Sequence, residues 1–272
     1  MTRLVVPCAL AVTLTMTAGC RTAQRAAAGV VLPVSQENEL GREMERELAR
    51  ELRLLDDPQV VGYVQELGRQ IVQAADGDVP DGIEFKFHVV DDDATINAFA
   101  IPGGGIYVFT GLLRAMEDEA QLTAVLGHEV AHVTRRHIAQ QLTAQFGFQA
   151  LTAMLGSAGG LTGLVGQLGG AVASQGFLLK YSRDNEREAD YVGLGYQARA
   201  GWDPRGMMEF FTILQHMDEG RGRPPAFLLT HPAPDERVIN AHRRIAELQP
   251  TPTRRNRERY QQMLGHLGAP TK

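Results

Sequence analysis

Hydrophobic residues recur every three or four positions in two successive stretches of the chain, residues 36–54 and 57–75. This spacing lines them up on one face of an α-helix, so it predicts two amphipathic helices. In the first stretch, charged residues fill the positions between, which is typical of a face exposed to solvent. The second opens with Asp57 and Pro58, and proline is favoured in a first turn because its missing N–H needs no partner there.

The period then changes from helical to alternating. After the turn-forming stretch 76–82, residues 83–90 alternate between apolar and polar side chains, as in a half-buried strand. Residues 96–110 predict two further strands, joined by a glycine turn at 103–105, and a helical period returns over 118–141. This order of elements predicts an α+β fold that is mainly helical, with a small β-sheet beside the helix at 118–141.

Three polar residues inside that last helix suggest metal chemistry. At about 100° per residue, His132 lies ~40° from His128 and one turn away, so both imidazoles point to the same place. Glu129 lies ~100° from His128, where it could reach a water on a bound metal without being a ligand. H-E-x-x-H at this spacing is the signature of zinc hydrolases. His137 is predicted to face away from His128, as a surface or packing residue.

A catalytic zinc site needs a third protein ligand, and the stretch YSRDNEREADYVG offers one. Glu186 and Asp190 share a helical face, whereas Glu188 points away. One carboxylate of such a pair can bind zinc while the other accepts the N–H of a ligating imidazole. Considered alone, the stretch favours a charged, solvated helix. Together with His128 and His132, it favours a His₂Glu site.

Four stretches carry a resemblance to a known family. NAFAIPGGGIYVFTGLL, LTAVLGHEVAHVTRRH, YSRDNEREADYVG and LLTHPAPDERV occur in an order and spacing similar to those of the gluzincin-type zinc metallopeptidases that include BepA, LoiP, HtpX and the CaaX-prenyl proteases. The resemblance covers about residues 36–248. The chain differs from the membrane members in having no clear spanning helix. It differs from BepA in leaving no room after Leu248 for an array of helical repeats.

The resemblance implies one Zn²⁺ per chain and a role for each residue of the site. His128, His132 and Glu186 would be the ligands, and Asp190 would support a ligating histidine. The fourth position would hold a water whose pKa the metal lowers toward ~7. Glu129 would be the general base that takes the proton of this water and passes it to the leaving amine.

The resemblance also indicates residues that could contact the substrate. The strand around Asn97, Ala98 and Phe99 resembles an active-site edge that pairs with an extended peptide, although an ordinary core strand is the alternative. His231 and Arg237 fit the family's T-H-P-x-x-x-x-R arrangement and are candidates for stabilising the oxyanion. His231 could also occupy the fourth metal position in a resting state. A simple turn residue is the alternative for a histidine followed by proline.

Residues 137–179 contain no Asp, Glu, Lys or Arg and include the glycine-rich run GSAGGLTGLVGQLGG. Glycine disfavours a long helix by about 1 kcal/mol per residue relative to alanine. Three interpretations stay open for this segment: a close-packed hairpin of small residues, a mobile lid near the metal, or a surface that touches a membrane or an unfolded protein.

The first residues predict a location in the cell envelope. One positive charge, Arg3, precedes an apolar run that is shorter than the ~20 residues a membrane span needs, as in a secretory signal. The stretch TAGC resembles a bacterial lipoprotein processing site, so Cys20 is predicted to be lipidated. Arg21 after it favours, by the same resemblance, sorting to the outer membrane. The other cysteine, Cys8, would be removed with the signal, leaving no disulfide pair.

The expected organisation is a lipoprotein signal peptide at 1–19, a linker at 20–34, one zinc metallopeptidase domain at 35–250, and a short tail at 251–272 with no repeat domain. Among the 272 residues, 22% are charged and the net charge is −5. A mildly acidic chain with scattered basic residues has no electrostatic basis for binding nucleic acid, so membrane attachment would have to come from lipid.

The predicted function is that of a zinc-dependent endopeptidase, lipid-anchored at the periplasmic face of the outer membrane. Its substrates would be misfolded or misassembled envelope and outer-membrane proteins, and the outer-membrane assembly machinery is a candidate partner. The alternative, from another functional class, is a chaperone or assembly factor for outer-membrane proteins whose protease site is gated or latent.

Overall fold

The computed structural model describes residues 32–155, 157, 159–160, 162–166, 181–221, 224–231, 234–249 and 252–269. The predicted signal peptide, Cys20 and most of the predicted linker lie outside these residues, as does part of the glycine-rich segment. Within the described parts of the chain, no helix is both long and apolar enough to span a membrane.

The two N-terminal helices confirm the helical spacing. Helix α2 (Val34–Glu51) buries Leu40, Met44 and Leu48, and α3 (Pro58–Ala74) begins at a cap in which the Asp57 carboxylate accepts two backbone N–H groups. Such a cap satisfies donors that the first turn of a helix cannot pair internally. The charged face of α2 is not wholly solvated, because Glu37 is only 2% exposed.

The sheet has the three predicted strands, β1 (Lys86–Val90), β2 (Ala98–Ala100) and β3 (Gly105–Phe109), in the order β1-β3-β2. β1 runs parallel to β3, and β2 runs antiparallel to it. The glycine turn forms the short 3-10 helix η1 (Pro102–Gly104), in which Gly103 has a φ of 80° that other residues adopt only with strain. Helix α4 (Thr110–Ala115) follows directly after β3.

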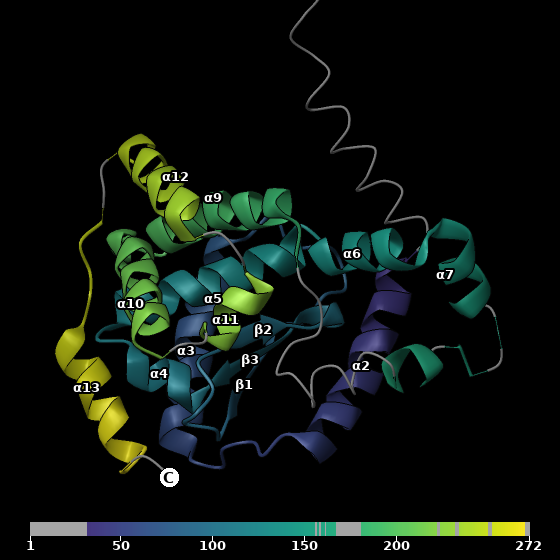
Figure 1. The fold of residues 1–272 in the computed structure, drawn as a ribbon, viewed down its shortest axis with the longest axis horizontal. Coiled ribbons are helices and arrows are strands. Elements are labelled where there is room, and N and C mark those ends of the chain that lie inside the picture. Colours follow the sequence, from purple (N-terminus) through teal and green to yellow (C-terminus); the bar gives the residue numbers. More distant parts are fainter. Residues whose placement is uncertain are drawn as a thin grey trace, which may run out of the picture.

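Helix α5 (Glu119–Thr134) runs through the centre of the molecule, between the sheet and α9 (Arg183–Arg199) (Figure 1). Every residue of α5 is buried, as expected for a helix that is apolar on most sides. It crosses α9 where two glycines meet. A Cβ added at Gly193 would lie 2.7 Å from the backbone of Gly127, so only glycine permits this approach.

The prediction of one continuous helix over residues 118–141 was wrong. α5 ends at Thr134, and Arg136 adopts a left-handed conformation with a φ of 56°. A new helix, α6 (His137–Phe146), begins after this break and is followed by α7 (Phe148–Leu155). No glycine or proline marks this break in the sequence, and the apolar spacing continues across it.

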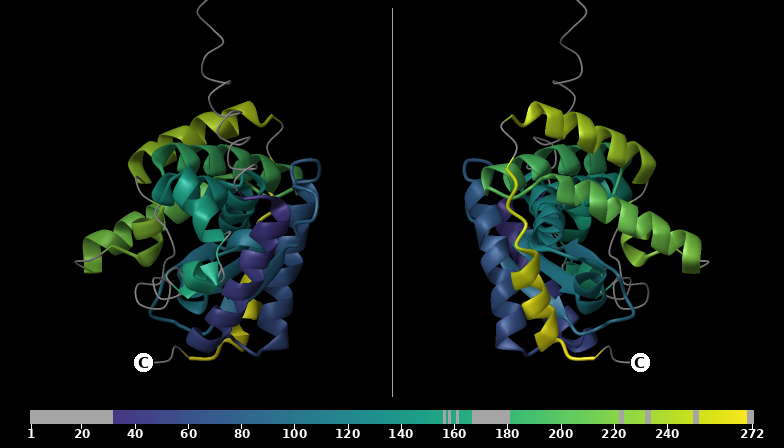
Figure 2. Two further views of the ribbon diagram at one scale, coloured as in Figure 1. Left: turned by 90° about the vertical axis from the view of Figure 1, so that its right-hand side faces the viewer. Right: turned by 90° about the vertical axis from the view of Figure 1, so that its left-hand side faces the viewer.

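The remaining helices are α10 (Arg205–Arg221), α11 (Ala226–Thr230), α12 (Pro234–Glu247) and α13 (Arg257–His266). The first three lie near α5 and α9 (Figure 1), whereas α13 lies beside α3 (Figure 2). The segment predicted to be a tail is therefore packed into the fold. Tyr260 of α13 is fully buried.

A buried polar network joins this last segment to the start of α5. Glu119 accepts hydrogen bonds from Tyr63 Oη at 2.6 Å, Asn256 Nδ2 at 2.8 Å and Arg259 Nη1 at 3.1 Å. Arg255 Nε donates to the neighbouring Asp118 carboxylate at 2.8 Å. Because Asp118 and Glu119 are fully buried, these donors replace the hydrogen bonds that water would otherwise give to their oxygens.

Candidate metal centre

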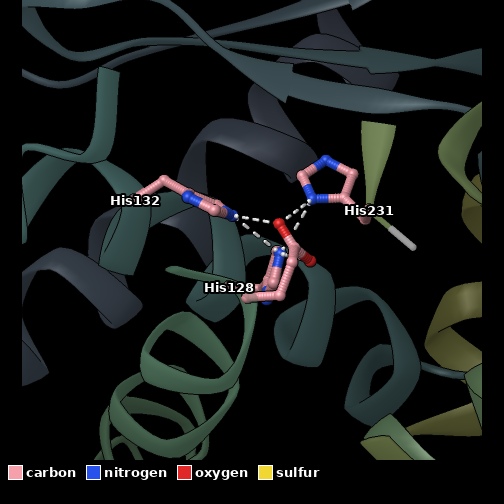
Figure 3. A group of neighbouring side chains, drawn as sticks. His128, His132 and His231 are labelled. Carbon is pink, nitrogen blue, oxygen red and sulfur yellow. Dashed lines mark hydrogen bonds and ion pairs between the residues drawn. The ribbon is translucent and has the colours of Figure 1, made fainter. Parts of the chain in front are cut away.

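Three elements bring the predicted ligands together. α5 supplies His128 and His132, α9 supplies Glu186, and His231 stands at the end of α11. Figure 3 shows the three histidine rings converging on one point. All four side chains are buried, and each offers a donor atom within 4.8 Å of the others. The helix crossing at the two glycines is what allows α9 to present its carboxylate so close to α5.

The distances between donor atoms are short and similar. Nε2 of His128 lies 2.9 Å from Nε2 of His132 and 3.1 Å from Nδ1 of His231. Oε1 of Glu186 lies 3.0 Å from Nδ1 of His231 and 3.4 Å from Nε2 of His132. Donors bound tetrahedrally at about 2.0–2.1 Å from one ion are separated by about 3.3–3.4 Å. These residues therefore fit a single tetrahedral metal ion with three nitrogen ligands and one oxygen ligand.

A second layer of side chains holds the ligands in place. Oδ1 of Asp190 lies 2.9 Å from Nδ1 of His128, on the side of the ring away from the cluster. Arg237 donates two hydrogen bonds of 2.7 Å to Asp190, and its Nη1 lies 3.1 Å from Oε2 of Glu186. All of these groups are buried, so the guanidinium supplies the charge that two neighbouring carboxylates require.

The charges of this layer set the protonation of the carboxylates. Burial by itself raises the pKa of Asp190, but the charge and hydrogen bonds of Arg237 outweigh it and leave that pKa below its usual value. For Glu186, burial is again opposed, by the charges of His231, Arg237 and His128, and the pKa is held well below its usual value. Both groups are therefore carboxylates at neutral pH, as a metal ligand and its support must be.

Glu129 is in a different situation. It is fully buried, and neither of its carboxylate oxygens has a hydrogen-bond partner among the described residues. Its nearest ionisable contact is Nε2 of His231, 3.6 Å from Oε1. Burial raises its pKa above the usual value although nearby positive charges oppose this. A buried carboxyl group with a raised pKa, and with no hydrogen-bond partner among the described residues, has the properties of a general base when it lies beside a cluster of potential metal ligands.

Arg237 is placed differently from an oxyanion donor. Besides its contacts with Asp190 and Glu186, its Nη1 donates to the backbone oxygen of His231 at 3.1 Å. The guanidinium stacks on the ring of Phe211, with its carbon 4.4 Å from the ring centroid. Each nitrogen of the group is thus already directed at a residue of the protein, which favours a role in holding the ligands over direct contact with a substrate.

The predicted substrate strand lies next to the site. β2 is at the edge of the sheet and packs against α5, and the backbone N–H of Phe227 at the start of α11 donates to the oxygen of Ile96 just before it. The side chains of Asn97, Ala98 and Phe99 are buried. The strand thus combines both features considered for it, an edge position and a buried face.

Two neighbours of His132 were not anticipated. The ring of Tyr181 stacks on it with a centroid distance of 3.8 Å. His137, which the sequence predicted to face away, is fully buried and has its Nδ1 2.9 Å from Nδ1 of His132. Tyr181 precedes the helical stretch of α9, so no spacing rule pointed to it. For His137, the unforeseen break at Arg136 reversed the predicted direction.

Comparison with known proteins places these features in a family. The sequence pattern of Peptidase family M48 matches residues 58–245. The chain is 35% identical over 236 residues to a beta-barrel assembly-enhancing protease of Yersinia pestis, covering 83% of this chain and 47% of that protein. The corresponding protein of Escherichia coli (strain K12) is 34% identical over 234 residues, covering 82% and 46%. Mitochondrial metalloendopeptidase OMA1 of Schizosaccharomyces pombe is 34% identical over 167 residues, covering 61% and 48%. The chain spans about half the length of these relatives.

Proposed function

Because the chain belongs to peptidase family M48, we propose that it is a zinc-dependent endopeptidase that cleaves misfolded or misassembled proteins of the bacterial cell envelope. The observation that carries the proposal is the meeting of three histidines and Glu186 at one buried point, beside the carboxyl group of Glu129, which has no hydrogen-bond partner among the described residues. The names of the bacterial relatives support a protein substrate and a connection with β-barrel assembly.

In this proposal His128, His132 and Glu186 hold one zinc ion, which supplies a Lewis acid for the attacking water and for the scissile carbonyl. Asp190 accepts the Nδ1–H of His128, which leaves the Nε2 lone pair directed at the ion. Arg237 keeps Asp190 and Glu186 ionised and fixes their positions. These contacts set the geometry of the site before a substrate arrives.

Glu129 performs the proton transfers. Its carboxylate takes a proton from the attacking water as the oxygen bonds to the carbonyl carbon, and it delivers that proton to the nitrogen as the C–N bond breaks. The absence of a hydrogen-bond partner within the described residues leaves its oxygens available for this exchange. The buried position also excludes competing water, which strengthens the interaction of charges at the site.

His231 acts as a gate in this proposal. Its Nδ1 takes the fourth position of the donor set, where the attacking water must otherwise stand, and its Nε2 faces Glu129. This position supports a resting state in which His231 blocks the site. Swinging His231 aside would open the fourth position and let its ring donate a hydrogen bond to the oxyanion. The same closed geometry favours the second candidate function, an assembly factor or chaperone whose protease site stays latent.

The proposed location is the periplasmic face of the outer membrane, with lipidated Cys20 as the anchor. The resemblance of TAGC to a lipoprotein processing site supports it, and two or more acyl chains would give stable attachment where one chain gives only marginal binding. Cys20→Ser should release the protein from the membrane fraction or leave its signal unprocessed. Unchanged fractionation, with no added mass on Cys20 of the wild type, would contradict the anchor.

Cleavage of labelled casein by the purified protein tests the protease proposal. We expect cleavage that a chelator abolishes and that stoichiometric zinc restores. Cleavage that persists after the metal has been removed would rule out a metallopeptidase. If the zinc-loaded protein leaves casein intact yet suppresses the aggregation of an unfolded outer-membrane protein, the assembly-factor function is supported in its place.

A further inference from the structure

His137 lies outside the ligand set, but the fold directs its ring at a ligand. Had α5 continued, His137 would stand five residues and about 140° around the helix from His132, out of contact. The helix instead ends at Thr134, and the left-handed Arg136 breaks the helical path before α6 begins at His137. Nδ1 of His137 thereby lies 2.9 Å from Nδ1 of His132, and both rings are fully buried.

Helix α2 stabilises the turn that places His137. Arg136 donates from Nε and Nη2 to Oε2 of Glu37 at 2.9 and 2.7 Å. Its Nη2 also contacts the backbone oxygen of Leu32 at 2.5 Å. The Glu37 side chain is 2% exposed and that of Arg136 is 16% exposed, so this is a largely buried pair formed by residues far apart in the chain. A non-glycine residue in the left-handed region persists only where its surroundings hold it there.

The contacts assign a direction to each hydrogen bond. Nε2 of His132 faces His128 and Glu186, so a metal would take its lone pair and leave its hydrogen on Nδ1. Within the described parts of the chain, this N–H faces Nδ1 of His137 at 2.9 Å, and to accept it His137 must carry its own hydrogen on Nε2. An acceptor stands at this end, because Oε2 of Glu188 lies 3.5 Å from Nε2 of His137.

We propose that His137 is a positioning residue for the metal ligand His132. It accepts the Nδ1–H of His132 and directs its own Nε2–H at Glu188, and these contacts fix the tautomer and the angle of the ligating ring. This inference rests on the proposed function, in which His132 binds zinc. It gives the two histidine ligands different supports, the Asp190 carboxylate for His128 and an imidazole for His132. Partners of this kind raise the affinity of a site for its metal about 10–100-fold.

Two polar substitutions separate this role from simple packing. In His137→Asn, the amide oxygen is attached to Cγ, where Nδ1 stood, so it can accept from His132. In His137→Gln, the amide lies one bond further out, near the former Nε2, and cannot reach Nδ1 of His132. The proposal predicts zinc affinity close to the wild type for Asn and roughly 10–100-fold weaker for Gln and for His137→Leu. A packing role predicts the reverse order for Asn and Gln, because Gln fills more of the buried volume.

The measurements are zinc affinity by competition with a chromogenic chelator and the visible spectrum of the cobalt-substituted protein, with circular dichroism to confirm folding. His216→Leu, at an exposed histidine of α10, is the matched control and should leave both unchanged. Equal zinc affinity of the folded Asn and Gln variants, with unaltered cobalt spectra, would overturn the proposal. If His132→Ala binds zinc as tightly as the wild type, the proposed function itself has failed, whatever the His137 variants do.

Discussion

Replacing Arg237 by methionine should strongly destabilise the protein. Methionine keeps most of the apolar contact with Phe211 but removes the cation from two buried carboxylates, Asp190 and Glu186, which are 4% and 2% exposed. Leaving buried charges without their partner costs about 3–5 kcal/mol. Because His128 remains beside both carboxylates, we expect the low end, about 3 kcal/mol. In a domain of this size that lowers the unfolding midpoint by about 6–12 °C.

The pH dependence of this loss identifies its cause. In the wild type, Arg237 holds the pKa of Asp190 and of Glu186 below their usual values, so these groups stabilise the fold above the unfolded pKa and lose that contribution as the pH falls through the folded pKa. Without the guanidinium, burial raises both values. The difference in stability between wild type and variant should therefore be largest near neutral pH and should shrink toward pH 4.

Thermal unfolding of the metal-free proteins, followed by circular dichroism across this pH range, measures the effect. Arg187→Met is the matched control, since Arg187 also pairs with two carboxylates, Asp184 and Glu236, but is 42% exposed. Exposed pairs contribute about 0–1 kcal/mol, so its midpoint should hardly move. A loss below about 1 kcal/mol for Arg237→Met at neutral pH, or a loss independent of pH, would refute the assignment of Arg237 as the charge partner of the site.

Three further substitutions address the ligands, the gate and the helix crossing. Glu129→Gln should still bind about one zinc per chain but lose hydrolysis by roughly 10²–10⁴-fold, whereas His132→Ala should lose the metal as well. Normal turnover by the Gln variant would contradict the mechanism. His231→Ala should raise casein cleavage because the fourth position opens; a fall of about 10²-fold would instead identify oxyanion stabilisation as its main role. Gly193→Ala should destabilise the fold by about 1–3 kcal/mol and weaken zinc binding, because its Cβ would lie 2.7 Å from the Gly127 backbone and force α9 away from α5. Urea unfolding and zinc titration measure the two effects. Unchanged stability and zinc affinity would show that the helix crossing can accommodate the methyl group.

Features that depend on spacing within one helix could be predicted from the sequence. The side-by-side placement of His128 and His132, and of Glu186 and Asp190, follows from the geometry of one helical turn. The three strands and the glycine turn were also predicted, because alternation and turn-forming residues are local signals. What brings the two helices together is a contact between single glycines, and a lone glycine in a helix carries no indication of its partner.

The features that the sequence could not predict depend on distant residues. The break after α5 occurs at Arg136, which has no intrinsic preference for the left-handed region. It is held by Glu37, which lies 99 residues earlier in the chain. Glu37 itself lies in a stretch whose dense charge predicts solvent exposure. Tyr181 contacts His132 from outside any helix. In each case tertiary contacts, which no local pattern reports, decide the outcome.

The buried network at the start of α5 has a consequence for the order in which the molecule is completed. A chain made from its N-terminus contains the HEVAH stretch long before it contains residues 254–259. Until these arrive, Glu119 and Asp118 lack the Arg259, Asn256 and Arg255 donors that stabilise them in the interior. The start of the helix that bears His128 and His132 therefore lacks three of its polar contacts while the chain is incomplete. The residues that complete the start of this helix are thus among the last of the chain to be made.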